Sequence, residues 1–305
     1  MTLGSTLRTL VIATLTAATL SGCYPYRLTG DDVVPTDARL TAAGMRMTPG
    51  LPLAEVGARL GLTVTEETLP AAFGPVALTR FEHSTSGTGP KPLIVFCGGN
   101  MFRRELGGQK VAALLAPLGD VWIFDYPGYG DSAGQGTPDQ FEAMNQAISA
   151  RVDHAFATGR TGDLAFWGHS LGGTVCGDLA GRTDHASDLV LISTFQSFEQ
   201  VIRAGAAQKA GPLGGLVRPV VGEDVPRFDL GTALQGYRGT AVVVGARNDD
   251  TVPFLATARL EQTLRHEGVA TRMIVLPAAD HSRIQETPGL IDQIAEALKA
   301  AGFGD

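Results

Sequence analysis

Cysteines, runs of basic residues and long apolar stretches are scarce in this chain of 305 residues. Its 3 cysteines and 6 histidines are scattered without the short spacings of zinc ligands, so we expect neither a metal nor another cofactor. The 24 Lys and Arg residues form no run and the net charge is −7, which excludes a nucleic-acid partner, because phosphate binding needs a basic surface. No stretch after residue 22 is apolar enough to span a bilayer, which excludes a spanning helix there.

What the chain does contain fits one globular domain. Hydrophobic residues make up 44% of the sequence and charged residues 18%, which is ordinary for an α/β protein of this length. No internal repeat is present. We expect a monomer.

The first 22 residues have the pattern of a secretory signal. Arg8 and the amino terminus form a positive region, an apolar run covers residues 10–20, and the small residues Ser21 and Gly22 follow. That apolar run is too short to cross a bilayer.

Leu20-Ser21-Gly22-Cys23 resembles the lipobox of bacterial lipoproteins. The resemblance implies cleavage before Cys23 and acylation of that residue, and each buried CH₂ of an acyl chain contributes about 0.8 kcal/mol to membrane binding. It further implies a lipid-anchored protein of the bacterial cell envelope, on its periplasmic or extracellular face, and on the outer membrane in a Gram-negative cell. A plain cleaved signal with an unmodified Cys23 stays open. Residues 23–50 hold few large apolar residues and several prolines, which predicts a tether, with the domain over residues 51–305.

Within the domain, two antiparallel strands are expected first, at Leu62–Leu69 and Val76–Glu82. After Pro92, short apolar runs alternate with helical stretches, which is typical of a mostly parallel sheet with helices on both faces. The expected strands are Leu93–Cys97, Val121–Tyr126, Leu164–Trp167, Leu189–Ser193, Ala241–Gly245 and Met273–Leu276. The expected helices are Arg104–Leu115, Pro138–Ala157, Leu171–Ala180, Pro253–His266 and Pro288–Ala301.

The sequence Gly168-His-Ser-Leu-Gly172 lies between one of these strands and a helix. A Gly-x-Ser-x-Gly motif in that context predicts a sharp turn that presents the Ser170 hydroxyl above the sheet. Gly168 and Gly172 permit the close backbone approach that such a turn needs. We therefore predict that Ser170 is a nucleophile.

Ser170, an acid in the loop after Gly245 and His281 after the last strand occur in the chain order Ser, Asp, His. Serine needs a base to activate it, and the base needs an acid that fixes its tautomer. His281 is the predicted base, because it alone among the histidines follows the last predicted strand.

Five motifs carry a family resemblance: Phe96–Asn100, Asp125–Ser132, Gly168–Gly172, Asp249–Pro253 and His281. With them, the chain from about Leu62 resembles the α/β-hydrolase fold, and most of all its lid-poor serine hydrolases, which include acyl-protein thioesterases and related lipases. The family spacing places the acid four residues before a proline, which implies Asp249 and leaves Asp250 as the alternative.

The resemblance also implies an oxyanion hole of two backbone amides, those of Leu171 and Asn100. Gly98 stands where relatives often have His, so a side chain that braces this loop is missing here. We interpret the glycine-rich stretch from Asp125 to Gly136 as a structural turn beside the site. Residues 196–239 predict a small cap before the acid's strand.

Cys97 and Cys176 have no role in this scheme. One is at a strand end and the other is inside a predicted helix, so we expect two buried thiols, with a disulfide as the alternative in an oxidising compartment.

These features together predict a serine hydrolase that cleaves carboxylic esters or thioesters through an acyl-enzyme at a membrane surface. The substrate would be a small-molecule or lipid-derived ester. A peptidase or amidase of the same fold, and a non-catalytic lipoprotein that serves as a binding module, stay open as alternatives.

Overall fold

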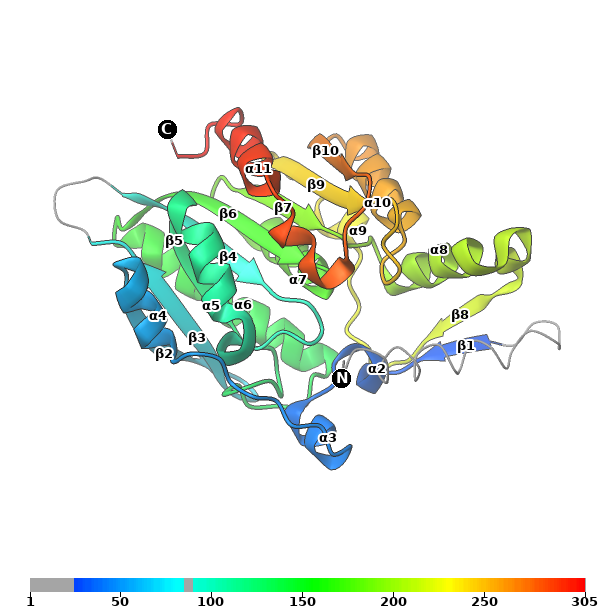
Figure 1. The fold of residues 1–305 in the computed structure, drawn as a ribbon, viewed down its shortest axis with the longest axis horizontal. Coiled ribbons are helices and arrows are strands. Elements are labelled where there is room, and N and C mark those ends of the chain that lie inside the picture. The colour runs from blue at the N-terminus through cyan, green and yellow to red at the C-terminus, as the bar shows by residue number, and fades with distance from the viewer. Residues whose placement is uncertain (1–24, 85–89, 305) are drawn as a thin grey trace.

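The computed structural model describes residues 25–84 and 90–304, so the predicted signal segment and Cys23 lie outside the described residues. An eight-stranded sheet forms the centre of the protein (Figure 1). Its strands in chain order are β2 (Thr63–Ala71), β3 (Gly74–Glu82), β4 (Lys91–Cys97), β5 (Asp120–Phe124), β6 (Thr161–His169), β7 (Asp188–Ile192), β9 (Thr240–Ala246) and β10 (Ala270–Leu276).

The spatial order of the strands is β10-β9-β7-β6-β4-β5-β3-β2. Strand β3 pairs antiparallel with β2 and with β5, and the other pairs are parallel. The prediction of a mostly parallel sheet preceded by two antiparallel strands is confirmed.

The central strands are apolar on both faces because both faces are covered. In β4, Leu93 and Val95 belong to one buried cluster, whereas Ile94 and Phe96 belong to a second cluster across the sheet. This alternation follows from the two-residue period of a strand, and it explains why the sequence shows continuous apolar runs.

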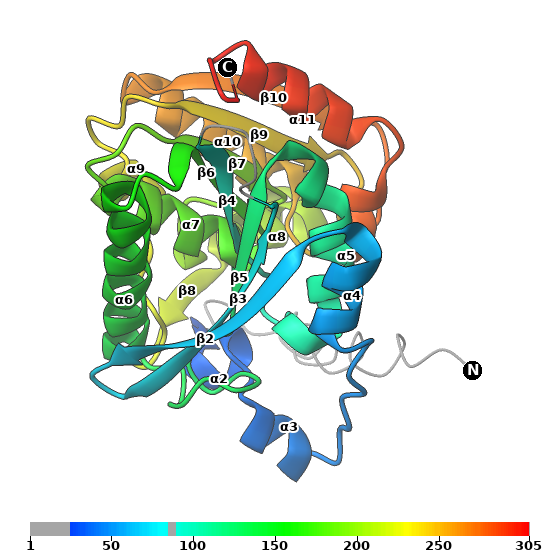
Figure 2. The same cartoon turned by 90° about the vertical axis from the view of Figure 1, so that its left-hand side faces the viewer.

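Helices cover the two faces (Figure 2). Those whose side chains join the first cluster include α6 (Pro138–Ala157), α7 (Leu171–Arg182), α9 (Leu230–Ala233) and α10 (Phe254–His266). Those of the second cluster are α4 (Leu53–Leu60), α5 (Arg104–Leu115) and α11 (Leu290–Lys299). A short 3₁₀ turn, η1 (Ala116–Leu118), follows α5.

The segment before the sheet is packed, which contradicts the predicted tether for residues 25–42. It forms β1 (Pro25–Leu28), α2 (Gly30–Val33) and α3 (Asp37–Ala42). Arg103 donates from Nε to the Asp37 carboxylate at 2.8 Å and from a terminal nitrogen to the Pro35 carbonyl at 2.7 Å. The segment has few apolar side chains, but four of them, at positions 28, 33, 34 and 40, are buried. The packed structure therefore begins well before residue 51.

Residues 196–239 form the cap. They contain α8 (Phe198–Ala210), the 3₁₀ segment η2 (Gly211–Leu216), strand β8 (Arg218–Val221) and α9. Strand β8 pairs in parallel with β1, in a register that runs from Pro25 opposite Arg218 to Leu28 opposite Val221. The N-terminal segment is thus joined to the cap by backbone hydrogen bonds.

Cys97 and Cys176 form a disulfide with a Cα–Cα distance of 5.8 Å, so the prediction of two separate thiols is wrong. The pairing arises because the start of α7 lies against the end of β4. A Cβ placed on Gly172 would lie 1.9 Å from the Cys97 carbonyl oxygen, which shows how closely the two elements approach.

Among residues 25–84 and 90–304, no helix combines the length and the apolar character that crossing a membrane requires.

Candidate active site

Ser170 lies at the junction of β6 and α7, with φ 56° and ψ −124°. A non-glycine residue rarely adopts this region, and such strain concentrates at functional sites. A Cβ on Gly168 would lie 2.4 Å from the Gly172 carbonyl oxygen, so the turn tolerates no side chain there. The structure therefore has the sharp strand-to-helix turn that the sequence predicts.

The strained turn is held by strand β7 and the residues that follow it. The Ser170 amide donates to the Ile192 carbonyl at 2.9 Å. The Thr194 hydroxyl donates to the Ser170 carbonyl at 2.7 Å, and Thr194 is fully buried. Sequence reasoning missed Thr194, whose one signal was its place directly after a predicted strand.

Asp249 and His281 are brought together as the sequence predicts. His281 Nδ1 lies 2.8 Å from Asp249 Oδ2. The other carboxylate oxygen of Asp249 accepts the amides of Thr251 and Val252, each at 2.9 Å. Asp250 is exposed and contacts the Thr251 hydroxyl instead, so of the two candidate acids it is Asp249 that meets His281.

The Asp249 carboxylate is buried yet remains the charged partner of this pair. Burial alone would raise its pKa, but the hydrogen bond and positive charge of His281, with the amides of Thr251 and Val252, lower the pKa below its usual range. An ionised acid fixes Nδ1 as the protonated nitrogen of His281 and leaves Nε2 as an acceptor.

His281 begins the 3₁₀ segment η3 (His281–Glu286), which follows β10 after a short loop. The Trp167 indole donates to Gln285 Oε1 at 3.0 Å and ties this segment to the sheet. His169 Nε2 donates to the His281 carbonyl at 2.9 Å, and the two rings lie 4.9 Å apart. Burial and the neighbouring His281 lower the pKa of His169 to about 4, so His169 is neutral near pH 7.

The His169 contact links the nucleophile turn to the base, because His169 immediately precedes Ser170. Ser170 and His281 are both 9% exposed. In the described part of the chain, no hydrogen bond yet joins the Ser170 hydroxyl to the His281 ring. Catalytic hydrogen bonds often shorten only when substrate binds.

The two residues of the predicted oxyanion hole lie on segments that adjoin Ser170. Leu171 is the first residue of α7, where amides have no partner within the helix. The loop that carries Asn100 abuts the turn, since a Cβ on Gly99 would lie 3.5 Å from Ser170 Cβ. Within the described residues, neither the Leu171 nor the Asn100 amide donates a hydrogen bond, so both are available to a ligand.

Two tyrosines hold the loop of Asn100. The Tyr126 hydroxyl donates to the Gly98 carbonyl at 2.6 Å, and the Tyr129 hydroxyl donates to the Asn100 carbonyl at 2.5 Å. Both come from the glycine-rich stretch that the sequence marks as a structural turn. Its contribution is to hold the peptide units on either side of the one that carries the Asn100 amide.

The space beside Gly98 is filled by Phe102. A Cβ on Gly98 would lie 2.3 Å from the Phe102 ring, and that ring packs against Phe96 with centroids 5.2 Å apart. The loop therefore is braced, by Phe102, although no histidine stands at position 98.

Sequence reasoning also missed two buried arginines beneath this loop. Arg104 donates from Nε to Asp125 at 2.9 Å and from a terminal nitrogen to Asp131 at 2.7 Å. Arg103 lies over the Tyr129 ring, with its guanidinium carbon 3.5 Å from the ring centroid. In the sequence, these two arginines appear only as a dipeptide at the start of a predicted helix. Arginine is common at such positions, so the dipeptide did not indicate a buried role.

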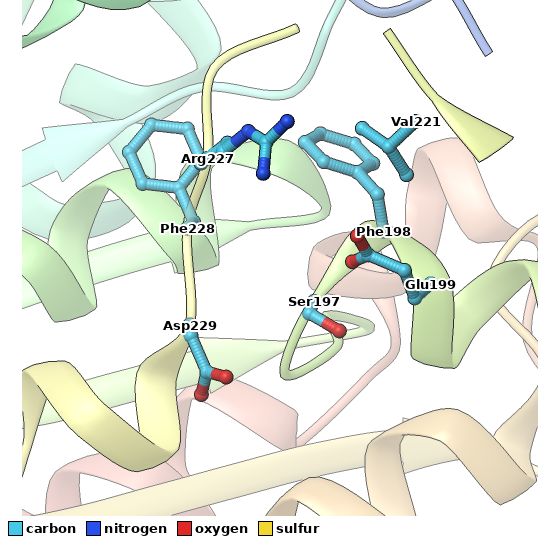
Figure 3. Close-up of a pocket in the computed structure, with 7 residues that line it drawn as sticks. All are labelled: Ser197, Phe198, Glu199, Val221, Arg227, Phe228 and Asp229. Atoms are coloured by element: carbon cyan, nitrogen blue, oxygen red, sulfur yellow. The ribbon is translucent and has the colours of Figure 1, made fainter. Parts of the chain in front are cut away.

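A cavity of about 380 Å³ lies elsewhere, within the cap (Figure 3). It is lined by Ser197, Phe198, Glu199, Val221, Arg227, Phe228 and Asp229. Ser170, Asp249 and His281 do not line it, so this cavity is separate from the candidate catalytic residues. Among the described residues, no cluster of His, Cys, Asp and Glu could hold a metal ion.

Comparisons with known proteins agree with this architecture. A family model described as the alpha/beta hydrolase fold matches residues 92–221. An uncharacterized protein of Mycobacterium tuberculosis is 28% identical over 217 residues, which cover 70% of this chain and 68% of that protein. The structure of an esterase from Pyrococcus furiosus superposes with a TM-score of 0.62 at 14% identity, covering 84% of this chain and 95% of the esterase. For an esterase from Mycobacterium marinum, the TM-score is 0.56 at 19% identity, covering 82% and 85%.

The chain thus has the α/β-hydrolase fold, with a mostly parallel central sheet flanked by helices.

Proposed function

We propose that this protein is a serine hydrolase that cleaves carboxylic esters or thioesters through an acyl-enzyme. The observation that carries the proposal is the Asp249–His281 hydrogen bond, 2.8 Å long, beside a Ser170 held at φ 56°. The esterases with the same fold support ester hydrolysis as the reaction class.

In the proposed mechanism, Ser170 Oγ attacks the ester carbonyl carbon while its proton moves to His281 Nε2. Asp249 stays ionised and stabilises the imidazolium through Nδ1. The tetrahedral intermediate collapses when His281 returns the proton to the leaving oxygen or sulfur. A water molecule, activated by the same nitrogen, then releases the acid and restores Ser170.

Negative charge on the carbonyl oxygen would be stabilised by the Leu171 and Asn100 amides. One such donor is worth about 10²- to 10³-fold in kcat in serine hydrolases. The tyrosine contacts to the Gly98 and Asn100 carbonyls orient this loop before substrate arrives.

Labelling with a fluorophosphonate tests the proposal directly, because the reagent reacts only with an activated serine. We expect wild type to be labelled and Ser170→Ala to be unlabelled, with circular dichroism as a check of folding. A folded wild type that takes no label would instead indicate a binding module. Labelling of Ser170→Ala at the wild-type level would reject Ser170 as the nucleophile.

The cap contributes only α8, η2, β8 and α9, which favours an open site and short to medium acyl chains. An acyl series of p-nitrophenyl esters, measured as kcat/KM, tests this, because each CH₂ buried in a pocket adds about 0.8 kcal/mol until the pocket ends. Parallel assays with matched amides separate an esterase from a peptidase. A rate that rises only above the critical micelle concentration of a long-chain ester would indicate a mobile lid instead.

We further propose that Cys23 is acylated and anchors the protein to a bacterial membrane. The support is the Leu-Ser-Gly-Cys sequence at the end of the apolar segment. Intact-mass analysis of protein extracted from membranes should find a chain that begins at Cys23 and carries acyl groups. An unmodified Cys23 would contradict the anchor without affecting the proposed chemistry.

A further inference from the structure

One part of the molecule projects from the body of the domain. Helix α8 and strands β8 and β1 extend to one side of the sheet in Figure 1, and η2 connects α8 to β8. We call these four elements, residues 25–28 and 198–221, the arm.

The arm carries the most exposed apolar side chains. Leu213 and Leu216 of η2 are 69% and 57% exposed, the highest values among the large apolar residues of the described chain, and Val220 is 38% exposed. Exposed apolar residues that gather in one short segment mark an interaction site.

The β1–β8 ribbon extends this surface with positive charge. Its exposed residues alternate with buried or half-buried ones: Pro25 and Arg27 point outward on β1, and Arg218 and Val220 on β8. The register places Arg27 opposite Val220 and Pro25 opposite Arg218, so both arginines share the outer face. Within the described residues, neither Arg27 nor Arg218 forms an ion pair.

The start of the chain indicates what this surface meets. Cys23 precedes Pro25 by two residues, which span at most about 7 Å of extended chain. Pro25 pairs with Arg218, which follows η2 after a single residue. An acylated Cys23 would therefore enter a bilayer beside the two exposed leucines.

We propose that the outer face of the arm, formed by Leu213, Leu216, Val220, Arg27 and Arg218, docks on a bilayer that contains anionic phospholipid. The proposal rests on the acylation of Cys23 proposed above. Apolar side chains enter the interface while arginines meet the negatively charged headgroups, the combination that favours peripheral membrane binding.

Docking would also orient the active site. In the last turns of α8, Gln208 Nε2 donates to the Asp249 carbonyl at 3.4 Å, so the arm contacts the loop that carries the acid. A site held in this way would face the membrane surface and take acyl esters dissolved in the bilayer. Acyl esters dissolved in a bilayer are therefore the substrate class that we infer for the proposed serine hydrolase.

The test uses the full chain, expressed in a host that acylates lipoproteins and purified from its membranes. Leu213→Cys is labelled with an environment-sensitive fluorophore; the native cysteines at 97 and 176 do not react because they form a disulfide. The protein is reconstituted in vesicles of phosphatidylcholine with or without phosphatidylglycerol. Leu60→Cys serves as the matched control, because Leu60 is 38% exposed on α4, away from the arm.

We expect the label at position 213 to shift to shorter wavelength and brighten several-fold on reconstitution, more so with phosphatidylglycerol, and the label at position 60 to stay unchanged. Unchanged emission at 213 in acylated protein overturns the proposal. So does a shift that appears without vesicles as protein concentration rises, which would indicate a second copy of the chain. Intact mass is recorded on the same sample. An unmodified Cys23 overturns the proposal, because the proposal rests on the acylation of that residue.

The double variant Leu213→Ser/Leu216→Ser separates docking from chemistry. We expect it to hydrolyse a soluble p-nitrophenyl ester at the wild-type rate and a vesicle-embedded ester several-fold more slowly. Equal rates for variant and wild type on both substrates would contradict docking. Lack of activity in wild type on either ester would contradict the proposed hydrolase, while the fluorescence result still decides the docking surface.

Discussion

The Tyr129 hydroxyl donates a 2.5 Å hydrogen bond to the carbonyl of Asn100, whose amide is a proposed oxyanion donor. The same tyrosine ring stacks under Arg103, and Arg103 is held by Asp37 of the N-terminal segment. The segment that the sequence suggests is a tether therefore supports the active-site loop through two intermediates.

Tyr129→Phe tests this support. The lost hydrogen bond is worth about 1 kcal/mol, so we expect kcat to fall by about five- to tenfold with KM nearly unchanged, because the oxyanion amide acts in the transition state. Steady-state kinetics on a soluble ester measure kcat and KM separately. Tyr237→Phe is the matched control, since Tyr237 donates a similar 2.6 Å bond to Ser187, before strand β7 and away from the loop. A kcat loss of equal size in both variants would indicate a general effect on folding.

Asp249→Asn should leave the fold nearly intact and lower kcat by roughly 10³- to 10⁴-fold, because the amide cannot hold His281 in the required tautomer. Asp250→Asn is the paired control, and we expect activity close to wild type because its exposed side chain accepts a hydrogen bond from the Thr251 hydroxyl and does not meet His281. Should the loss appear in Asp250→Asn and not in Asp249→Asn, the assignment of the acid is wrong.

The lowered pKa of His169 predicts a dependence of stability on pH. With the folded-state pKa at about 4 and the ordinary value at 6.5, the unfolded chain binds a proton in this window that the folded chain does not. The free energy of unfolding should therefore fall as the pH falls from about 6.5 to about 4. The lowered pKa of Asp249 acts in the same direction at lower pH, since its contribution is lost as the pH falls through the folded-state value.

Urea unfolding at several pH values measures this slope. We expect His169→Gln, which removes the titration but keeps a side-chain donor, to flatten the slope between about pH 6.5 and 4. The same substitution at His266, whose side chain is 89% exposed, should leave the slope unchanged. An unchanged slope in His169→Gln would mean that His169 does not titrate abnormally.

Removal of the disulfide should destabilise the protein without removing the site. The bridge joins residues 79 positions apart, and closing a loop of this size in the unfolded chain is worth about 2–5 kcal/mol. We expect Cys97→Ala/Cys176→Ala to lower the free energy of unfolding by that amount and to keep most of the proposed hydrolase activity. Thiol titration of unfolded, unreduced wild type should detect neither of these two cysteines, and reactive thiols at both positions would contradict the pairing.

The sequence alone determined the features that depend on local sterics or on chain order. Gly168 and Gly172 bracket Ser170 because any Cβ there meets backbone atoms, and that requirement is visible in five consecutive residues. The apolar runs marked the strands, because a strand buried on both faces needs them. The loops of Asp249 and His281 could be placed together because parallel strands bring their carboxyl ends to one edge of the sheet. The choice of Asp249 over Asp250 came from the spacing of the family that the chain resembles.

Only the tertiary structure decided the contacts between distant segments. Asp37 pairs with Arg103 across 66 positions, and Cys97 pairs with Cys176 across 79. Neither the residue types nor their spacing in the sequence predicts such a pair. The same holds for Thr194 beneath Ser170 and for Tyr129 beneath Asn100. Each of these contacts depends on how loops from different strands pack at one edge of the sheet, and that packing is set by the whole fold and not by any local pattern.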